Sequence, residues 1–101
     1  MTDVGTASIR ALLNQHRDEV RAAARRCRGQ RVRLFGSGAR GEDRPDSDVD
    51  VLVDFEPGSS LFDVLHLTSE LESLLGRHVD VVSTGGLKPR DKHILDEAID
   101  L

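Results

Sequence analysis

The stretch FGSGARGEDRPDSDVDVLVDF, from Phe35 to Phe55, decides the fold. It holds the end of one predicted strand, a glycine-rich loop over 36–47 and a second predicted strand over 48–55. In the second strand valines alternate with mostly acidic residues, which is the period of two expected for β-structure. A glycine-serine turn followed by carboxylates inside an apolar strand is costly for an ordinary core. The pattern therefore indicates a site for a ligand that carries phosphate and metal together.

Asp48 and Asp50 are the first candidate site residues. Residues i and i+2 of a strand point to the same face, so the two carboxylates are neighbours with no basic residue between them. Like charges at this separation raise each other's pKa and cost stability, and a divalent cation bound to both removes that cost. A solvated face of an antiparallel sheet is the alternative, and it is favoured for the pair taken alone.

The loop that begins at Gly36 supplies the second part of the predicted site. Gly36 permits backbone angles that other residues resist, and Ser37 adds a hydroxyl beside consecutive backbone N–H groups, which form anion-binding nests in such turns. Gly38 and Gly41 are expected to keep the loop pliable. An ordinary glycine turn is the alternative. Because the loop to Asp48 is short, we expect this phosphate cradle to lie beside the carboxylates.

Asp80 is the third part, because it interrupts the apolar strand predicted over 79–82. A charge in such a run is costly unless it is paired or bound to metal. If this strand lies beside the strand over 48–55, three carboxylates face one site and can hold two divalent ions, for which Mg²⁺ suits oxygen ligands. The alternative is an edge-strand charge that opposes aggregation.

The other elements surround this site. Apolar spacing predicts a helix over 8–28, capped by Thr6 or Ser8 and ended by Gly29. The remaining predictions are a strand over 31–35, a helix over 60–75, a loop over 83–90 and a last helix capped by Asp91. The order α-β-β-α-β-α predicts an α/β (α+β) fold, a small mixed β-sheet flanked by helices in a single domain over 1–101.

Several apolar sets are expected to form the core. Cys27, the only cysteine, is predicted to be a buried thiol on the first helix. The inner stripe of the helix over 60–75 is expected to be Leu61, Val64, Leu65, Leu67, Leu71, Leu74 and Leu75. The last helix is expected to dock on the core through Ile94, Leu95, Ala98 and Ile99.

Composition narrows the functional class. The chain has 101 residues, a formal net charge of −4, no Tyr and no Trp. It has no apolar run of the length that a membrane-spanning helix needs and no signal-peptide pattern at its start, so we expect a cytoplasmic protein without membrane contact. The net acidity argues against direct binding of long nucleic acid.

The combined motif resembles the signature of the polymerase β-type nucleotidyltransferase superfamily. The residues that carry the resemblance are Gly36-Ser37, Ala39-Arg40-Gly41-Glu42 and Ser47-Asp48-Val49-Asp50. More narrowly, the chain is similar to the minimal nucleotidyltransferases (MNT proteins), which consist of little beyond a catalytic core. The resemblance extends to HVDVVSTGGLKPR over 78–90 and ILDEAI over 94–99. It implies a polymerase β-like nucleotidyltransferase core.

The resemblance also implies a role for each site residue. Gly36 and Ser37 would hold the triphosphate of ATP. Asp48 and Asp50 would bind both of two Mg²⁺ ions, and Asp80 would complete the metal site used by the attacking hydroxyl. These three aspartates are the predicted catalytic residues.

Arg40 is a further candidate for nucleotide binding. It either reaches a phosphate or pairs with Glu42 or Asp46 as a structural contact, and the structural role is slightly favoured. Two roles are also open for Lys88 and Arg90. They either contact the nucleotide or a partner protein, or they belong to an ordinary solvated loop. A larger side chain is common in this superfamily at the position of Gly38, so the rigidity of the loop is in question there.

The family implies nucleotidyl transfer, in which an acceptor hydroxyl attacks the α-phosphate of ATP and pyrophosphate leaves. MNT proteins are antitoxins of HEPN-domain ribonuclease toxins and can transfer AMP to a tyrosine of the toxin. Two alternatives remain. One is a non-catalytic antitoxin that occludes its partner. The other is a small-molecule (antibiotic) nucleotidyltransferase, ranked lower because those enzymes carry an extra acceptor-binding domain. The sequence also leaves open whether the chain forms a homo-oligomer.

Overall fold

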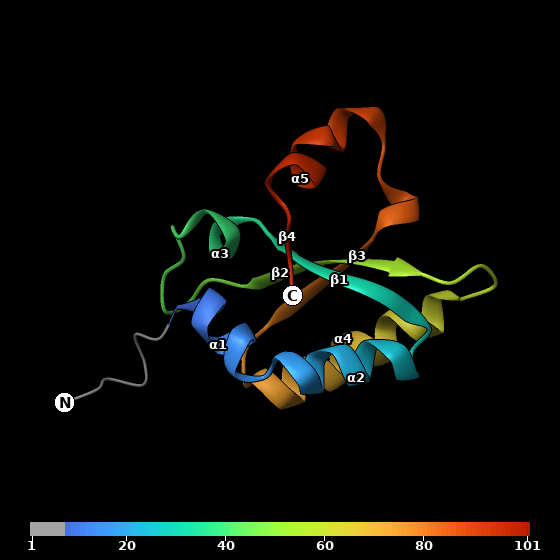
Figure 1. The fold of residues 1–101 in the computed structure, drawn as a ribbon, viewed down its shortest axis with the longest axis horizontal. Coiled ribbons are helices and arrows are strands. Elements are labelled where there is room, and N and C mark those ends of the chain that lie inside the picture. Colours follow the sequence, from blue (N-terminus) through green and yellow to red (C-terminus); the bar gives the residue numbers. More distant parts are fainter. Residues whose placement is uncertain (1–7) are drawn as a thin grey trace.

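The computed structural model describes residues 8–101, in which four strands form one mixed sheet with the order β3-β2-β1-β4 (Figure 1). The central strand β1 (Gly29–Phe35) runs antiparallel to β2 (Val49–Phe55) and to the short β4 (Ile99–Asp100). Strand β2 runs parallel to β3 (Val79–Ser83). The predicted mixed α/β architecture is therefore confirmed.

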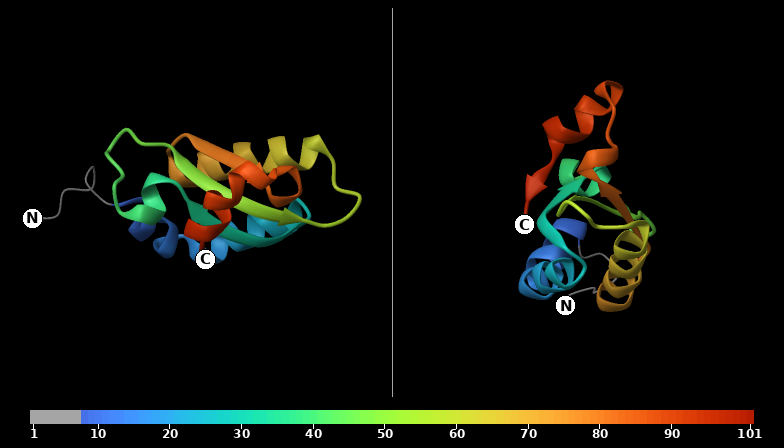
Figure 2. Two further views of the ribbon diagram at one scale, coloured as in Figure 1. Left: turned by 90° about the horizontal axis from the view of Figure 1, so that it is seen from above. Right: turned by 90° about the vertical axis from the view of Figure 1, so that its right-hand side faces the viewer.

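The helices lie on both sides of this sheet. Figures 1 and 2 show α1, α2 and α4 covering one face, whereas α5 stands on the opposite side. A short helix, α3, follows β1 directly, and two 3₁₀ turns, η2 and η3, connect β3 to α5. Their bounds are α1 Ile9–Gln15, α2 Arg17–Arg26, α3 Ser37–Arg40, α4 Leu61–Leu75, η2 Thr84–Gly86, η3 Pro89–Asp91 and α5 Lys92–Glu97.

The hydrophobic core lies between the sheet and the three helices that cover it. Alternation along β2 places Val49, Val51 and Val53 in this core, all of them fully buried. The opposite face of the same strand carries Asp50 and Asp54. Other members of the core cluster include Ile9, Leu13, Val20, Ala23, Ala24, Cys27, Val32, Leu34, Leu67, Leu71 and Val79. The predicted burial of Cys27 is thus confirmed.

The helix predicted over 8–28 is wrong in one respect, because it is two helices. The chain breaks at His16, which has φ −108° and ψ 21° and caps both α1 and α2. Ser8 caps the start, and its Oγ accepts a hydrogen bond of 3.0 Å from the amide of Ala11. The alternative cap, Thr6, lies outside the described residues. Apolar residues keep the same spacing on both sides of the break, so periodicity alone does not reveal it.

The end of α2 also differs from the prediction. Gly29 does not terminate the helix but begins β1, while Arg28 takes the left-handed conformation with φ 65°. A Cβ atom at Gly29 would lie 2.9 Å from Val53 Cγ1 and 3.0 Å from the carbonyl oxygen of Ala24. Glycine is therefore required here by close packing of helix against strand.

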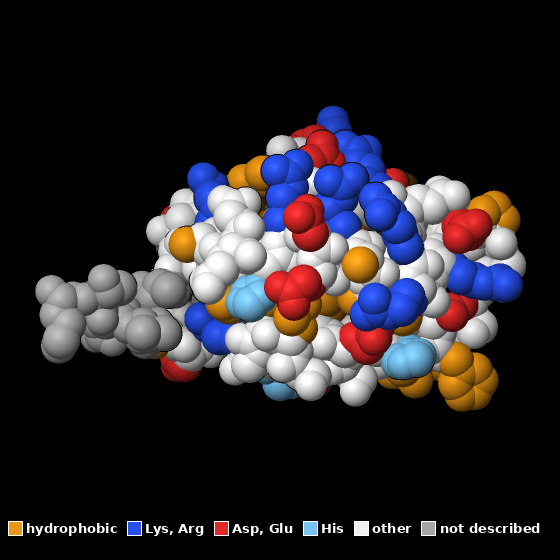
Figure 3. All heavy atoms as spheres, turned by 60° about the horizontal axis from the view of Figure 1, so that its bottom comes forward, with side chains coloured by type: hydrophobic (Ala, Val, Ile, Leu, Met, Phe, Trp, Pro, Cys, Tyr) orange, Lys and Arg blue, Asp and Glu red, His pale blue; other side chains and the backbone are white. Residues whose placement is uncertain are grey.

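The inner stripe of α4 is shorter than predicted. Leu67, Leu71 and Leu75 are buried, whereas Leu61 and Leu65 are 70% and 56% exposed. Sequence spacing identifies the apolar face of a helix but not the length over which other elements cover it. The space-filling view of this side of the molecule shows charges of both signs between the exposed apolar atoms (Figure 3).

The C-terminal segment departs most from the prediction. Helix α5 contains no buried residue, and Leu95 and Ile99 are 40% and 38% exposed, so it does not join the core cluster. The chain is held instead by β4, which was not predicted because two residues are too few to show an alternating pattern. Ile99 pairs with Leu34, and the Leu101 amide donates a 3.1 Å hydrogen bond to the carbonyl of Val32. Within residues 8–101, no helix is both long and apolar enough to cross a bilayer.

Candidate active site

Three aspartates lie together on the sheet face opposite the core. Asp50 of β2 pairs in register with Asp80 of the parallel strand β3, so their side chains are neighbours on one face. Asp48 lies immediately before β2 and two residues before Asp50 in the chain. We refer to Asp48, Asp50 and Asp80 as the acidic cluster. The structure thus brings together the three carboxylates expected from the sequence.

The acidic cluster is electrostatically unfavourable without a cation. Burial raises the pKa of Asp50 above its usual range, and the negative charges of Asp80 and then Asp48 raise it further. The positive charge of Arg40 only partly opposes this rise. Asp50 is half-buried, while Asp48 and Asp80 are exposed. The site therefore has one carboxylate in the sheet surface and two that are accessible from solvent.

Gly36 joins the end of β1 to this cluster. Its backbone has φ 73° and ψ −155°, a conformation that is essentially restricted to glycine. A Cβ atom at this position would lie 2.3 Å from Asp50 Oδ2. Because nothing larger than hydrogen fits there, the backbone of the turn and the carboxylate of Asp50 are in direct contact. The predicted loop therefore lies beside the predicted carboxylates.

The rest of the loop contains a short helix. Ser37 begins α3, and Gly38, which was expected to keep the loop pliable, is buried in this helix. A Cβ at Gly38 would lie 2.8 Å from Ile9 Cγ2, which shows that α1 packs directly against this turn. The side chain of Ile9 thus fills the space that a larger side chain at position 38 would occupy. Gly41 ends α3 in the left-handed conformation, with φ 73°.

Arg40 takes part in a network that the sequence revealed only in part. Its guanidinium pairs with Glu42 at 2.7 Å, as one interpretation expected, and also with Glu97 Oε2 at 2.9 Å. The other oxygen of Glu97 accepts a 3.1 Å hydrogen bond from the amide of Gly36. No signal in the sequence pointed to Glu97, because an acidic residue in an exposed helix is usually a solvated one.

The donor set of the acidic cluster fits a hard divalent cation. All three residues offer carboxylate oxygens, and the mutual repulsion that raises the Asp50 pKa is the cost that a bound cation removes. As the side chains stand in residues 8–101, no three His, Cys, Asp or Glu groups already enclose a metal position. His78 approaches Asp48 at 3.9 Å and Glu72 at 3.6 Å, and it is largely exposed. Lys88 and Arg90 are exposed on the turns before α5.

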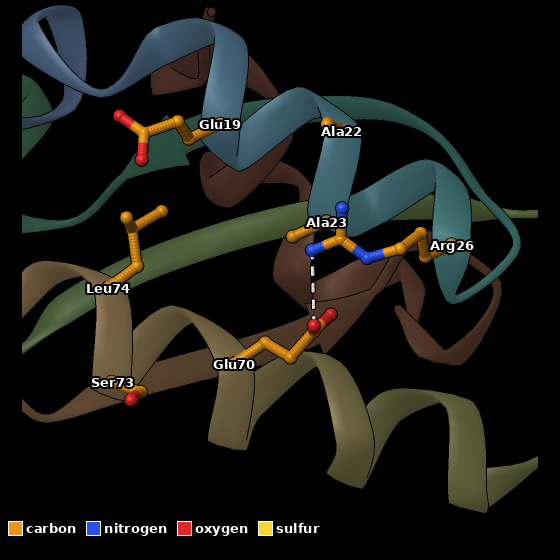
Figure 4. Close-up of a pocket in the computed structure, with 7 residues that line it drawn as sticks. All are labelled: Glu19, Ala22, Ala23, Arg26, Glu70, Ser73 and Leu74. Atoms are coloured by element: carbon orange, nitrogen blue, oxygen red, sulfur yellow. Dashed lines mark hydrogen bonds and ion pairs between the residues drawn. The ribbon is translucent and has the colours of Figure 1, made fainter.

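A hollow lies on the other side of the sheet from the acidic cluster, between α2 and α4 (Figure 4). Its volume is about 440 Å³, and Arg26 and Glu70 span it with an ion pair of 3.1 Å. The core and the sheet separate it from the acidic cluster. It is lined by Glu19, Ala22, Ala23, Arg26, Glu70, Ser73 and Leu74. None of the predicted site residues contributes to it.

Known proteins share both the sequence and the fold. Residues 13–100 match the family described as "Nucleotidyltransferase domain". "Protein adenylyltransferase MntA" of Thermococcus cleftensis is 44% identical over 80 residues, which are 79% of this chain and 78% of that protein. The solved structure of a "putative minimal nucleotidyltransferase" is 50% identical, with a TM-score of 0.80 over 88% of this chain and 92% of that one.

A more distant structural relative is the MNT antitoxin in complex with the tri-AMPylated HEPN toxin of Shewanella oneidensis. The matching chain in that complex is 18% identical to this one, with a TM-score of 0.65 over 86% of this chain and 69% of that one. At this identity the similarity shows a common fold.

Proposed function

This chain belongs to the nucleotidyltransferase domain family, and from that premise we propose that it transfers AMP from ATP to a hydroxyl group of a partner protein. The observation that carries the proposal is the direct contact between Gly36 and Asp50. The turn that we propose to bind phosphate therefore lies against the acidic cluster, which is the pairing that nucleotidyl transfer needs. An ordinary solvated sheet face would not require glycine at this position.

The proposal gives each residue of the site a role. Ser37 and the backbone amides of the turn hold the triphosphate of ATP. The acceptor hydroxyl then attacks the α-phosphate, so a new P–O bond forms to the acceptor while the bond to pyrophosphate breaks. Asp80 is exposed beside Asp50, and we propose that it accepts the proton of that hydroxyl. The acidic cluster would hold two Mg²⁺ ions, which when bound neutralise phosphate charge and lower the pKa of the hydroxyl.

We further propose that the acceptor is a tyrosine of a HEPN-domain toxin and that the chain acts as its antitoxin. The support comes from the relatives, one named as a protein adenylyltransferase and one found with an AMPylated HEPN toxin. The site is also open on the side of Asp48 and Asp80. An open site suits an acceptor that arrives on another protein.

The test is transfer of label from α-³²P-ATP with Mg²⁺ to a HEPN-domain protein of the same genome, resolved on a denaturing gel. We expect Asp48→Asn and Asp50→Asn to lower the rate by about two orders of magnitude, as loss of an electrostatic stabiliser does. Asp46→Asn, an exposed aspartate of the same loop, is the matched control and should retain activity.

Two outcomes would contradict the proposal. If the two proteins copurify but no label is transferred, the chain neutralises its partner by occlusion. If label appears on a free aminoglycoside without any protein partner, the chain is a small-molecule nucleotidyltransferase. A Tyr→Phe series in the HEPN protein identifies the acceptor, because loss of label at one position assigns the hydroxyl.

A further inference from the structure

We propose that Glu97 is an internal competitor for the nucleotide, a carboxylate that occupies the phosphate-binding groups until ATP displaces it. This inference rests on the function proposed above and adds a residue that sets nucleotide affinity. It depends on two contacts that a single side chain makes. One Glu97 oxygen accepts from the Gly36 amide at 3.1 Å, and the other pairs with Arg40 at 2.9 Å.

These two contacts use the groups that a phosphate would use. A backbone N–H at a glycine turn and an arginine guanidinium are the donors typical of phosphate sites. The carboxylate of Glu97 presents two oxygens with a negative charge and so imitates a phosphate edge. Because the Gly36 amide has a single N–H and it already bonds Glu97, an incoming phosphate oxygen has to replace the carboxylate at that amide. Glu97 would also repel a triphosphate in the same turn.

The charge of Glu97 also reaches the acidic cluster. Glu97 is among the groups that raise the pKa of Asp50, after burial and after Asp80 and Asp48. Its own pKa is lowered, because the hydrogen bonds from Arg40 and Gly36 outweigh the opposing effect of burial. The side chain is therefore an anion at neutral pH, bonded to the turn that lies against Asp50.

The element that carries Glu97 has little buried surface. Helix α5 has no buried residue, and Figure 1 shows it on the side of the sheet opposite α1, α2 and α4. The chain beyond it is held separately, because Asp100 bonds Arg31 at 2.7 and 3.0 Å. Segments with few buried contacts open at small free-energy cost. Displacement of Glu97 therefore does not require the sheet to come apart.

The experiment is calorimetric titration of the whole chain with ATP and Mg²⁺ and, separately, with inorganic triphosphate. The variants are Glu97→Ala and Glu97→Gln. If Glu97 occupies the donors about nine-tenths of the time, its removal lowers the apparent Kd about tenfold. Asp96→Asn makes the same charge change on the same helix, and Glu42→Gln removes only the other partner of Arg40. Both controls should change the Kd much less than the Glu97 variants.

The outcomes separate this inference from the proposed function. If wild type binds ATP and both Glu97 variants bind it equally or more weakly, Glu97 organises the turn and the inference is wrong while the function stands. If neither wild type nor any variant binds ATP, both are wrong. Amide hydrogen exchange on wild type is a second readout that needs no variant. We expect exchange over 92–97 to accelerate when triphosphate binds, and slower or unchanged exchange would overturn the inference.

Discussion

At the scale of single residues, Gly36 is the position where the candidate site most strictly requires one amino acid. We expect Gly36→Ala to lower the free energy of unfolding by about 2–5 kcal/mol, because it adds backbone strain of about 1–3 kcal/mol and an atom pressed against Asp50. Urea denaturation measures this loss.

A matched control exists at Gly41. It has the same φ of 73°, but a Cβ there meets no atom within 4 Å, so Gly41→Ala should cost only about 1–2 kcal/mol of backbone strain. Gly36→Ala should also cost less in an Asp50→Ala background, since the clash is then removed. Equal losses at the two glycines would show that contact with Asp50 does not constrain the turn.

Cys27 gives a prediction about pH. Burial raises its thiol pKa above the ordinary value of 9.0, and the charge of Glu70 raises it further. The folded chain therefore holds this proton more tightly than the unfolded chain. The stability that results is complete below pH 9 and is lost as pH rises through the folded pKa. We expect wild type to lose stability above pH 9 more steeply than Cys27→Ala, as measured by urea denaturation at each pH.

The chain suits this comparison because it has no tyrosine to titrate in the same range. Parallel stability curves for wild type and Cys27→Ala would mean that the thiol ionises equally in both states. Slow alkylation of the native thiol at pH 8 is an independent check, because only the thiolate reacts.

Residue patterns in the sequence predicted which carboxylates of the candidate site lie close together. Asp50 and Asp80 could be placed together because each interrupts an apolar strand, and a charge there needs a reason. Glu97 could not be placed in the site from the sequence, because its contact with Gly36 depends on how an exposed helix folds back over the turn. The local motif thus identified the turn and the carboxylates that lie together, whereas a contact between distant parts of the chain appeared only in the structure.

At the scale of elements, α4 shows where an apolar stripe ends. Leu67 is fully buried and Leu65 is 56% exposed, although both were predicted to lie on the inner stripe. We expect Leu67→Ala to cost about 2–5 kcal/mol of unfolding free energy, as a large-to-small core substitution does. Leu65→Ala should stay within about 0.5 kcal/mol. Chemical denaturation of the two variants measures both changes. Equal losses of unfolding free energy would mean that both side chains are covered in solution.

The predicted elements were accurate where periodicity was long and inaccurate where it was short. Strand β2 and helix α4 came out close to their predicted bounds because each has several repeats of its pattern. The break at His16 and the two-residue strand β4 leave no periodic signal. The left-handed residue at the end of α2 was also missed, since Arg28 takes it in place of the adjacent glycine.

At the scale of the whole molecule, β4 ties the C-terminal segment to the centre of the sheet. The Arg31–Asp100 ion pair reinforces it, and the hydrogen bonds from Arg31 lower the pKa of Asp100. This contribution is present above the ordinary carboxyl pKa of 3.8 and is lost as pH falls through the lower folded value. We expect Asp100→Asn to accelerate amide exchange at Leu101 at pH 6.

The acceleration should be smaller at high salt, because the pair is exposed and screened. An Asp96→Asn variant, with the same charge change outside β4, should leave this amide unchanged. Exchange at Leu101 that is the same in wild type and Asp100→Asn would show that backbone pairing alone holds the strand.

The position of β4 has a consequence for the order in which the molecule assembles. Strands β1 and β2 are joined by one loop, so their pairing closes a short stretch of chain and builds the Gly36 turn early. Pairing of β4 with β1 joins distant segments through two residues, and its loop-closure entropy is repaid by few contacts. We therefore expect the turn to be complete before Glu97 arrives during refolding. We also expect the pairing of β4 to open early in unfolding, so that the Gly36 turn and its proposed competitor are separated in time as well as in sequence.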